Sequence, residues 1–278
     1  MKTIEAAVVC DAVRRLAVEA ASQLEPDILE ALTRARDREG PGLARDVLDA
    51  LMVNADIASR EKLPVCQDTG IAVLFVSLGQ EVRVNGDLEA ALQEGVRRGY
   101  EEGFLRKSVC DPLARKNTGT NLPAVIHYEV VAGDRLEITL LPKGCGSENM
   151  SALSMLPPSA GKEGIVSFVV DTVLAAHANP CPPGIVGVGI GGTFERAALL
   201  AKKALLRRVG APHERQDVAL LEEQMLKEIN ARGAGVHGFG GRTSMLAVHV
   251  ELFPTHIASL PVAVNIQCHA HRYKRVVL

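Results

Sequence analysis

Short apolar stretches rich in valine, isoleucine and leucine constrain the fold most, because they alternate with longer segments of helical pattern. The stretches occupy residues 71–78, 124–131, 136–141, 185–190, 245–252 and 262–268. Their length and β-branched content are typical of buried strands. Apolar residues recur at helical spacing over residues 87–102, 164–178, 194–208 and 217–232. This order predicts a mixed α/β (α+β) body.

The first sixty residues predict helices. Val9, Val13 and Leu16 recur at helical spacing, Pro26 suits the first turn of a second helix, and a third follows the break at residues 40–42. We therefore expect a helical segment over residues 1–62 and a mixed-sheet body with cysteine-bearing loops over residues 63–278. Together they are expected to form a single domain, residues 1–278.

Two local signals refine this expectation. Asp87 is suited to cap the helix that follows it, because its side chain can accept a hydrogen bond from the first helical turn. Gly133 and Asp134 lie between the strands at residues 124–131 and 136–141, which makes that pair a candidate hairpin.

Composition excludes several classes of function. The 278 residues carry a net charge of −2, only 3% are aromatic and none is tryptophan. This leaves no electrostatic footprint for nucleic acid or an anionic membrane, and no set of stacking platforms for bases. No apolar run reaches the roughly 18–20 residues that span a bilayer. The N-terminus lacks the pattern of a signal peptide, so we expect a cytoplasmic protein whose six cysteines stay reduced.

Thiol, amide and carboxylate side chains gather with glycine and proline in four loops beside predicted strands. The loops read CQDTG at residues 66–70, NTGTNLP at 117–123, KGCGSEN at 143–149 and NPCPP at 179–183. Each alone has an ordinary explanation as a turn. Loops at strand ends are where open α/β folds hold ligands, so four together indicate a site. By spacing alone the cysteines form no short metal motif and are typical of small buried apolar residues.

A glycine run offers a different function. Gly187, Gly189 and Gly192 fit the GxGxxG pattern between a predicted strand and helix, which can hold a pyrophosphate. The acid expected about 20 residues later falls near Glu214, at no obvious strand end. Close packing of helix on strand is the plainer explanation, and a nucleotide-dependent oxidoreductase using residues 187–192 remains an alternative.

Among the histidines, His256 is the best candidate for a general acid or base. It follows Pro254 and Thr255 in a short loop, twelve residues before Cys268. His269 and His271 lie among charged residues and are expected to be exposed.

The four loops, in this order, resemble those of the class I fumarases and of the L-tartrate dehydratase α subunit. The similarity runs from about residue 5 to the end of the chain. It implies an iron–sulfur hydro-lyase with an oxygen-sensitive 4Fe–4S cluster, held by three thiolates with one iron open for substrate. Matched to the family's motifs, the ligands are Cys66, Cys181 and Cys268.

The same resemblance implies residues that contact the substrate, a small dicarboxylate. They are Gln67, Asp68, Arg106, Gly146 and His256. Arg106 is expected to bind a carboxylate, since a guanidinium pairs with it through two parallel hydrogen bonds. Asp68 and His256 are expected to handle the proton of the hydroxyl that leaves or arrives as water.

This chain departs from single-chain members of the family in several ways. Cys145 and Ile257 stand where those members usually have glycine. Those members are also roughly twice as long, so the resemblance implies that this chain is an α subunit. A separate β subunit, in an α2β2 assembly, is expected to supply the residue that accepts the carbon-bound proton.

The loops at residues 117–123 and 143–147, with the sequence IGGT at 190–193, are more similar to the fumarase version. The expected function is reversible hydration of fumarate to (S)-malate together with a β subunit. An L-tartrate dehydratase α subunit, the oxidoreductase named above and a non-catalytic cluster or scaffold protein are the alternatives.

Overall fold

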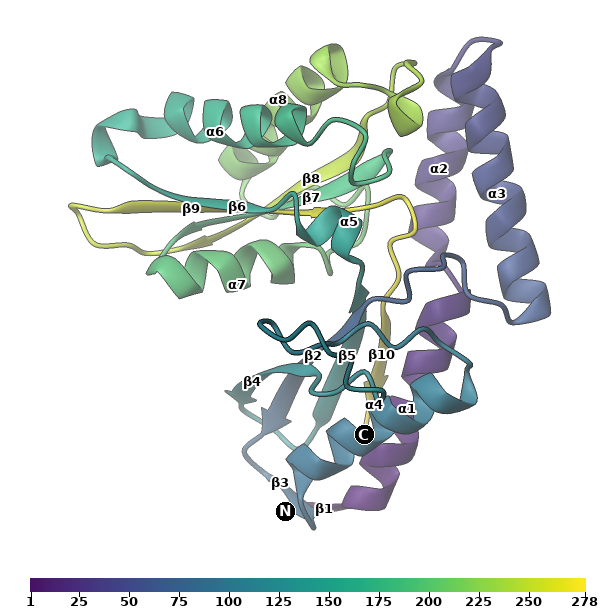
Figure 1. The fold of residues 1–278 in the computed structure, drawn as a ribbon. Helices are drawn as coiled ribbons and strands as arrows, with labels where there is room; N and C mark the ends of the chain where they lie inside the picture. Colours follow the sequence, from purple (N-terminus) through teal and green to yellow (C-terminus); the bar gives the residue numbers. More distant parts are fainter. The chain divides into compact units, whose positions relative to one another are not determined.

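A computed structural model describes all 278 residues (Figure 1). The chain divides into two compact units, each built from segments distant in the sequence. Unit 1 comprises Met1–Leu24, Asn54–Gly144 and Arg272–Leu278, and unit 2 comprises Glu25–Val53 and Cys145–His271. None of the helices has the length and apolar character needed to cross a membrane.

Unit 1 is a four-stranded sheet with two long helices packed on it (Figure 1). Its elements are β1 (Lys2–Glu5), α1 (Ala6–Ser22), β2 (Ile71–Gly79), β3 (Val82–Asn85), α4 (Leu88–Glu102), β4 (Val125–Val131), β5 (Leu136–Lys143) and β10 (Lys274–Val277). The strand order is β10-β5-β2-β4, and β1 pairs separately with β3. Strand β2 runs parallel to β4 and antiparallel to β5.

Small residues let the two helices of unit 1 approach closely. A Cβ added at Gly95 of α4 would lie 2.7 Å from the Cβ of Val13 in α1, and one at Gly99 would lie 2.7 Å from the Cβ of Ala17. Asp87 caps α4 as predicted, because its side chain accepts a hydrogen bond of 3.0 Å from the backbone N–H of Ala90.

Unit 2 is a second four-stranded sheet, covered by helices on both faces. Its elements are α2 (Pro26–Arg38), α5 (Cys145–Glu148), β6 (Ala152–Leu156), α6 (Gly161–Ala176), β7 (Gly184–Gly191), α7 (Phe194–Ala204), α8 (Gln216–Arg232), β8 (Met245–Phe253) and β9 (Leu260–Gln267). Short 3₁₀ helices span Pro158–Ala160 and Val236–Gly238. Helix α3 (Leu43–Glu61) begins in unit 2 and ends in unit 1.

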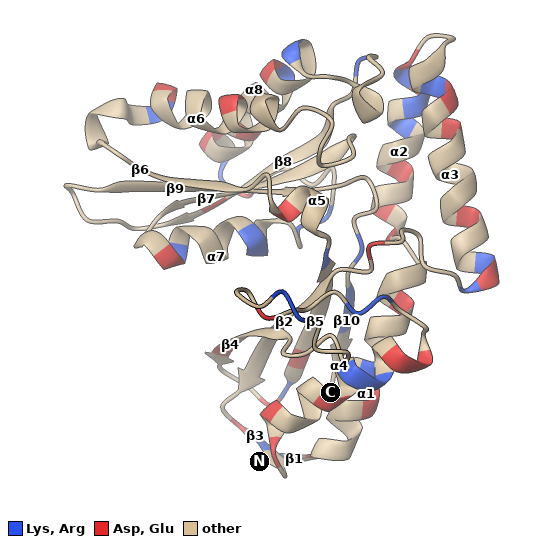
Figure 2. Ribbon diagram, in the orientation of Figure 1, with Lys and Arg blue, Asp and Glu red and all other residues tan.

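The strand order of unit 2 is β6-β9-β7-β8, with β7 parallel to β8 and antiparallel to β9. Helices α6 and α8 pack on one face and α7 on the other (Figure 1). The strands β6, β7 and β9 carry no charged residue, and the charges lie mainly on the helices (Figure 2). A sheet buried on both faces requires such apolar strands.

Close packing of α7 explains the glycine run. A Cβ at Gly187 would lie 2.0 Å from the carbonyl oxygen of Ala201, and one at Gly189 would lie 2.0 Å from that of Ala197. Only glycine fits beneath the helix at these two positions. Packing of α7 therefore accounts for two of the three glycines of the GxGxxG pattern.

The predicted fold class is confirmed: helices dominate the N-terminal region and mixed sheets follow. The candidate hairpin of β4 and β5 is wrong, because β2 lies between them and pairs with both. The N-terminal segment is helical, and its helices are divided between the units: α1 belongs to unit 1 and α2 to unit 2. Helical spacing shows which face of a helix is buried, but not which sheet covers it.

Candidate functional site

In unit 1 the loop at residues 66–70 is fixed by buried hydrogen bonds. The hydroxyl of Tyr100 lies 2.8 Å from the carbonyl oxygen of Thr69 and 3.0 Å from that of Gly70. Gly70 has a φ of +78°, and a Cβ there would lie 2.7 Å from the backbone nitrogen of Lys143. The loop therefore depends on glycine at this position. Burial is the main cause that raises the pKa of Tyr100, so its hydroxyl stays neutral.

Asn121 joins this loop to the segment that carries Arg106. Its side-chain nitrogen donates to the carbonyl oxygen of Gly70 at 3.2 Å, and its side-chain oxygen accepts from the backbone of Ser108 and Val109 at 2.7 and 3.2 Å. The Asn121 side chain is fully buried. The NTGTNLP loop thus contributes a structural amide.

The four predicted site residues of unit 1 lie close together. Cys66 is half-buried, with its Sγ 3.5 Å from Oε1 of Gln67. The side chain of Asp68 accepts a hydrogen bond from the backbone of Gly70 at 3.0 Å. The hydroxyl of Thr69, next in the chain, donates to the carbonyl oxygen of Arg106 at 2.9 Å.

Arg106 itself is exposed, so its guanidinium is accessible to an anion. A Cβ at Gly144, at the end of β5, would lie 3.2 Å from Oδ2 of Asp68. Unit 1 therefore presents a thiol, an amide, a carboxylate and a guanidinium on adjoining loops.

In unit 2 the structure brings the segments of Cys181 and Cys268 together. The carbonyl oxygen of Cys181 accepts a hydrogen bond from the backbone N–H of His269 at 3.2 Å and lies 3.0 Å from Nδ1 of its ring. Cys181 is exposed and has a φ of +54°, and Cys268 is half-buried just after β9. Two of the three predicted ligands, 87 residues apart in sequence, thus lie on touching segments.

A histidine pair borders these segments. Nε2 of His237 lies 3.2 Å from Nδ1 of His269, and the backbone N–H of His237 donates to the carbonyl oxygen of Pro182 at 2.9 Å. Burial lowers the pKa of His237. Sequence reasoning missed this pair, because the two residues are 32 positions apart and no motif links them.

The expected exposure of His269 and His271 is wrong. His269 is half-buried, and His271 is fully buried with its Nε2 2.8 Å from the carbonyl oxygen of Leu205. Their charged sequence neighbours suggested exposure, but the segment enters the interior after β9.

Helix α5 lies beside the segments that carry Cys181 and Cys268. A Cβ at Gly146 would lie 3.3 Å from the carbonyl oxygen of Asn179, so a side chain there would press on the NPCPP loop. The hydroxyl of Ser147 donates to the side chain of Gln267, the residue before Cys268, at 3.1 Å. Gly146 therefore lies near both cysteine segments of unit 2.

His256 lies elsewhere in unit 2. It is exposed in the loop between β8 and β9, beside a cavity of about 580 Å³ lined also by Phe194, Arg196 and Phe253. The loop lies before the start of β9 and Cys268 follows its end. At about 3.3 Å per residue, the eight residues of β9 separate the two by roughly 25 Å.

The structure holds no group of three or more His, Cys, Asp or Glu side chains arranged for a metal ion. The six cysteines form no disulfide. Cys66 belongs to unit 1, whereas Cys181 and Cys268 belong to unit 2. The donor set fits an iron–sulfur cluster chemically, because thiolates are its usual ligands and two of the three thiols lie on touching segments.

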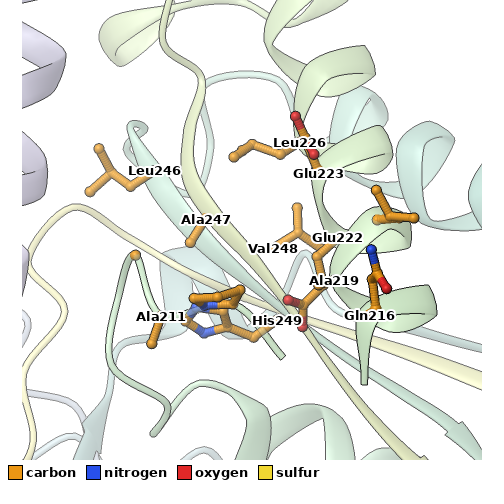
Figure 3. Close-up of a pocket in the computed structure, with 13 residues that line it drawn as sticks. Ala211, Gln216, Ala219, Glu222, Glu223, Leu226, Leu246, Ala247, Val248 and His249 are labelled. Atoms are coloured by element: carbon orange, nitrogen blue, oxygen red, sulfur yellow. The ribbon is translucent and has the colours of Figure 1, made fainter. Parts of the chain in front are cut away.

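An apolar cavity of about 330 Å³ lies between α8 and β8 (Figure 3). Glu222 at its wall pairs with Arg207 at 2.5 Å and accepts a hydrogen bond of 2.7 Å from the backbone of Val250. Burial, reinforced by the charge of Arg207, lowers the pKa of His249 to about 4. These groups are satisfied within the fold, and none of the predicted site residues lines this cavity.

Comparison with known proteins gives a consistent result. The family model described as "Fumarate hydratase (Fumerase)" matches residues 10–277. A relative from Methanocaldococcus jannaschii, named provisionally as an L(+)-tartrate dehydratase subunit alpha, is 42% identical over 271 residues, which is 95% of each chain. The L(+)-tartrate dehydratase subunit alpha of Escherichia coli strain UTI89 is 32% identical over 255 residues, covering 90% of this chain and 84% of its own. That of Shigella boydii is 31% identical over the same length.

Proposed function

The chain belongs to the fumarate hydratase family of hydro-lyases, and we propose that it is the α subunit of an iron–sulfur enzyme. The enzyme adds water to, or removes it from, a small dicarboxylic acid. The observation that carries the proposal is the contact between the segments of Cys181 and Cys268 in a chain of this family. We further propose that residues 1–278 act as a single catalytic domain.

The proposed ligands of a 4Fe–4S cluster are the thiolates of Cys66, Cys181 and Cys268. Three thiolates would leave one iron without a protein ligand, and a bound cluster would supply Lewis-acid polarisation of the substrate's C–O bond. A reducing cytoplasm, as expected from the sequence, suits three thiols that must stay unoxidised.

The chain's own residues bind and orient the substrate. The Arg106 guanidinium is exposed and pairs with a carboxylate. Gln67 and Gly146 are the further residues proposed to contact the substrate. The carboxylate of Asp68 holds or releases the proton of the hydroxyl that leaves or arrives as water.

For His256 the proposal is that it shares this proton transfer, but from a second copy of the chain. Within unit 2 it lies at the opposite end of β9 from Cys268. A substrate near Cys181 and Cys268 is therefore out of reach of His256 in the same chain. An assembly with two α subunits supplies a second His256.

Mixing two inactive variants tests this arrangement. His256→Asn and Asp68→Asn are each expected to lose most activity. If the residues act across copies, randomly mixed dimers regain about a quarter of wild-type activity, because half are mixed and one of their two sites is intact. No recovery in mixtures, with subunit exchange verified by mass spectrometry, would contradict the arrangement.

We propose fumarate and (S)-malate as the substrate pair, on the loop residues noted in the sequence. The second candidate is L-tartrate, favoured by the names of the M. jannaschii and E. coli relatives. Both need the same groups, so the choice concerns specificity rather than chemistry.

Anaerobic co-production with a candidate β subunit, followed by absorbance assays on fumarate, (S)-malate and L-tartrate, tests the function. We expect an α2β2 complex with dehydratase or hydratase activity, and cluster binding without turnover for the α chain alone. Activity on tartrate but not on fumarate would select the second candidate. A cluster-loaded complex inactive on all three would refute the proposed function.

A further inference from the structure

Arg272 is a buried arginine with only one of its three side-chain nitrogens hydrogen-bonded. Its side chain is 2% exposed, which makes it the largest fully buried side chain of the protein. Nη2 donates one hydrogen bond of 2.9 Å, to the backbone carbonyl oxygen of Asp68. Nε and Nη1 have no hydrogen-bond partner. Buried N–H groups of a charged guanidinium left unbonded carry a large desolvation penalty, so they point to a ligand.

The position of Arg272 in unit 1 links it to the proposed site. It lies two residues before β10, which pairs with β5, and its bond to Asp68 attaches it to the loop that carries Cys66 and Gln67. The hydroxyl of Thr69, next to Asp68, donates to the backbone of Arg106. Two arginines are thus joined to adjacent residues of one loop.

The charges of Arg272 and Asp68 both act on the buried hydroxyl of Tyr100. Burial is the main cause that raises the pKa of Tyr100, whose hydroxyl bonds to the same loop; the charge of Arg272 opposes this rise and that of Asp68 adds to it. The hydrogen bond to the backbone carbonyl of Asp68 holds the guanidinium at this loop before any ligand binds.

We propose that Arg272 is a substrate-binding residue, whose unbonded N–H groups take one carboxylate of the dicarboxylate substrate. Arg106 takes the other. The bond from Nη2 to Asp68 stays in place and holds the guanidinium toward the substrate. This inference rests on the proposed function, since it assumes a dianionic substrate at the 66–70 loop.

The test compares Arg272→Gln with Arg275→Gln in the cluster-loaded complex of α and β subunits. Arg275 is an exposed arginine three residues away that pairs with Glu137 at 3.5 Å, so it controls for a lost charge on the same segment. Anaerobic calorimetry with succinate, a dicarboxylate without a hydroxyl to lose, measures binding. We expect the dissociation constant to rise about 10- to 100-fold in Arg272→Gln, as for lost charged hydrogen bonds, and to stay unchanged in Arg275→Gln.

Kinetics and stability separate binding from a structural role. In Arg272→Gln, the KM for the dicarboxylate substrate is expected to rise by about the same factor as the dissociation constant of succinate. The iron content and the Tm of this variant are expected to equal those of the wild type. Arg272→Lys is expected to be intermediate, because it keeps the charge and loses the planar donors. Unchanged succinate affinity and KM in an active Arg272→Gln complex would overturn the role of Arg272 alone. Loss of iron or of folding in both Arg272 variants would also overturn the substrate-binding role, because it would show that Arg272 is needed for the structure. Failure of the wild-type complex to turn over any of the three acids would instead refute the proposed function, and this role with it.

Discussion

At the scale of single residues, the buried side-chain amide of Asn121 connects two of the segments that carry predicted site residues. Asn121 satisfies the carbonyl of Gly70 and two backbone N–H groups, so the 66–70 loop and the segment after Arg106 share one anchor. NTGTNLP carried the family resemblance, but its composition did not reveal which of its two asparagines is buried. The burial of Asn121 depends on contacts with distant segments, which the loop sequence alone does not show.

Asn121→Ala is expected to lower the free energy of unfolding of the isolated chain by ~3 kcal/mol. The backbone N–H groups of Ser108 and Val109 lose their partner, and the carbonyl of Gly70 keeps only the hydrogen bond from Tyr100. Asn117→Ala, which removes an exposed amide from the same loop, is the matched control and is expected to cost under about 1 kcal/mol. Urea unfolding followed by circular dichroism measures both. Equal losses would show that the burial of Asn121 contributes nothing special.

His249 makes stability depend on pH. Its folded pKa is about 4, mainly because burial disfavours the charged ring. An unfolded histidine titrates near 6.5, so between these values the unfolded state binds more protons. Stability from this group is complete above pH 6.5 and is lost as pH falls toward 4. Replacing it by Gln should flatten the pH dependence of unfolding free energy between pH 4.5 and 7, by up to ~3 kcal/mol. A wild-type slope in that variant would contradict the buried neutral ring.

At the scale of elements, the fit of α7 on β7 decides how the glycine run is understood. The pattern in the sequence allowed a phosphate loop, and only the depth of helix packing distinguishes the two explanations. The six long apolar strands were predictable, because apolar runs of this length are typical of buried strands. The short strands β1, β3, β6 and β10, of four or five residues each, were not predicted, because they are too short to show a pattern. The neighbours of β2 were not, since pairing order depends on contacts between distant segments.

Gly189→Ala is expected to destabilise the chain by about 3 kcal/mol or more, because the added methyl would overlap the carbonyl of Ala197 and force α7 outward. Gly40→Ala places its methyl in open space and serves as the control. Thermal unfolding distinguishes them: a large fall in Tm is expected only for the first. An unchanged Tm in Gly189→Ala would show that α7 leaves room for a methyl group above Gly189.

At the scale of the whole molecule, the sites predicted from sequence are distributed over two units. Within each unit the resemblance to a family selected residues that folding brings together: Cys66, Gln67, Asp68 and Arg106 in one, and Gly146, Cys181 and Cys268 in the other. His256 is the exception. Its position in sequence, twelve residues before Cys268, suggested proximity, but an intervening strand carries it to the far end of the sheet.

The central claim is that three thiolates from distant parts of the chain hold one cluster. Iron content per α chain after anaerobic reconstitution tests it most directly, in the wild type and in single Cys→Ser variants. We expect about four irons in the wild type and in Cys145→Ser, and a large loss in Cys66→Ser, Cys181→Ser and Cys268→Ser. Full iron content in any of these three, or its loss in Cys145→Ser alone, would contradict the claim.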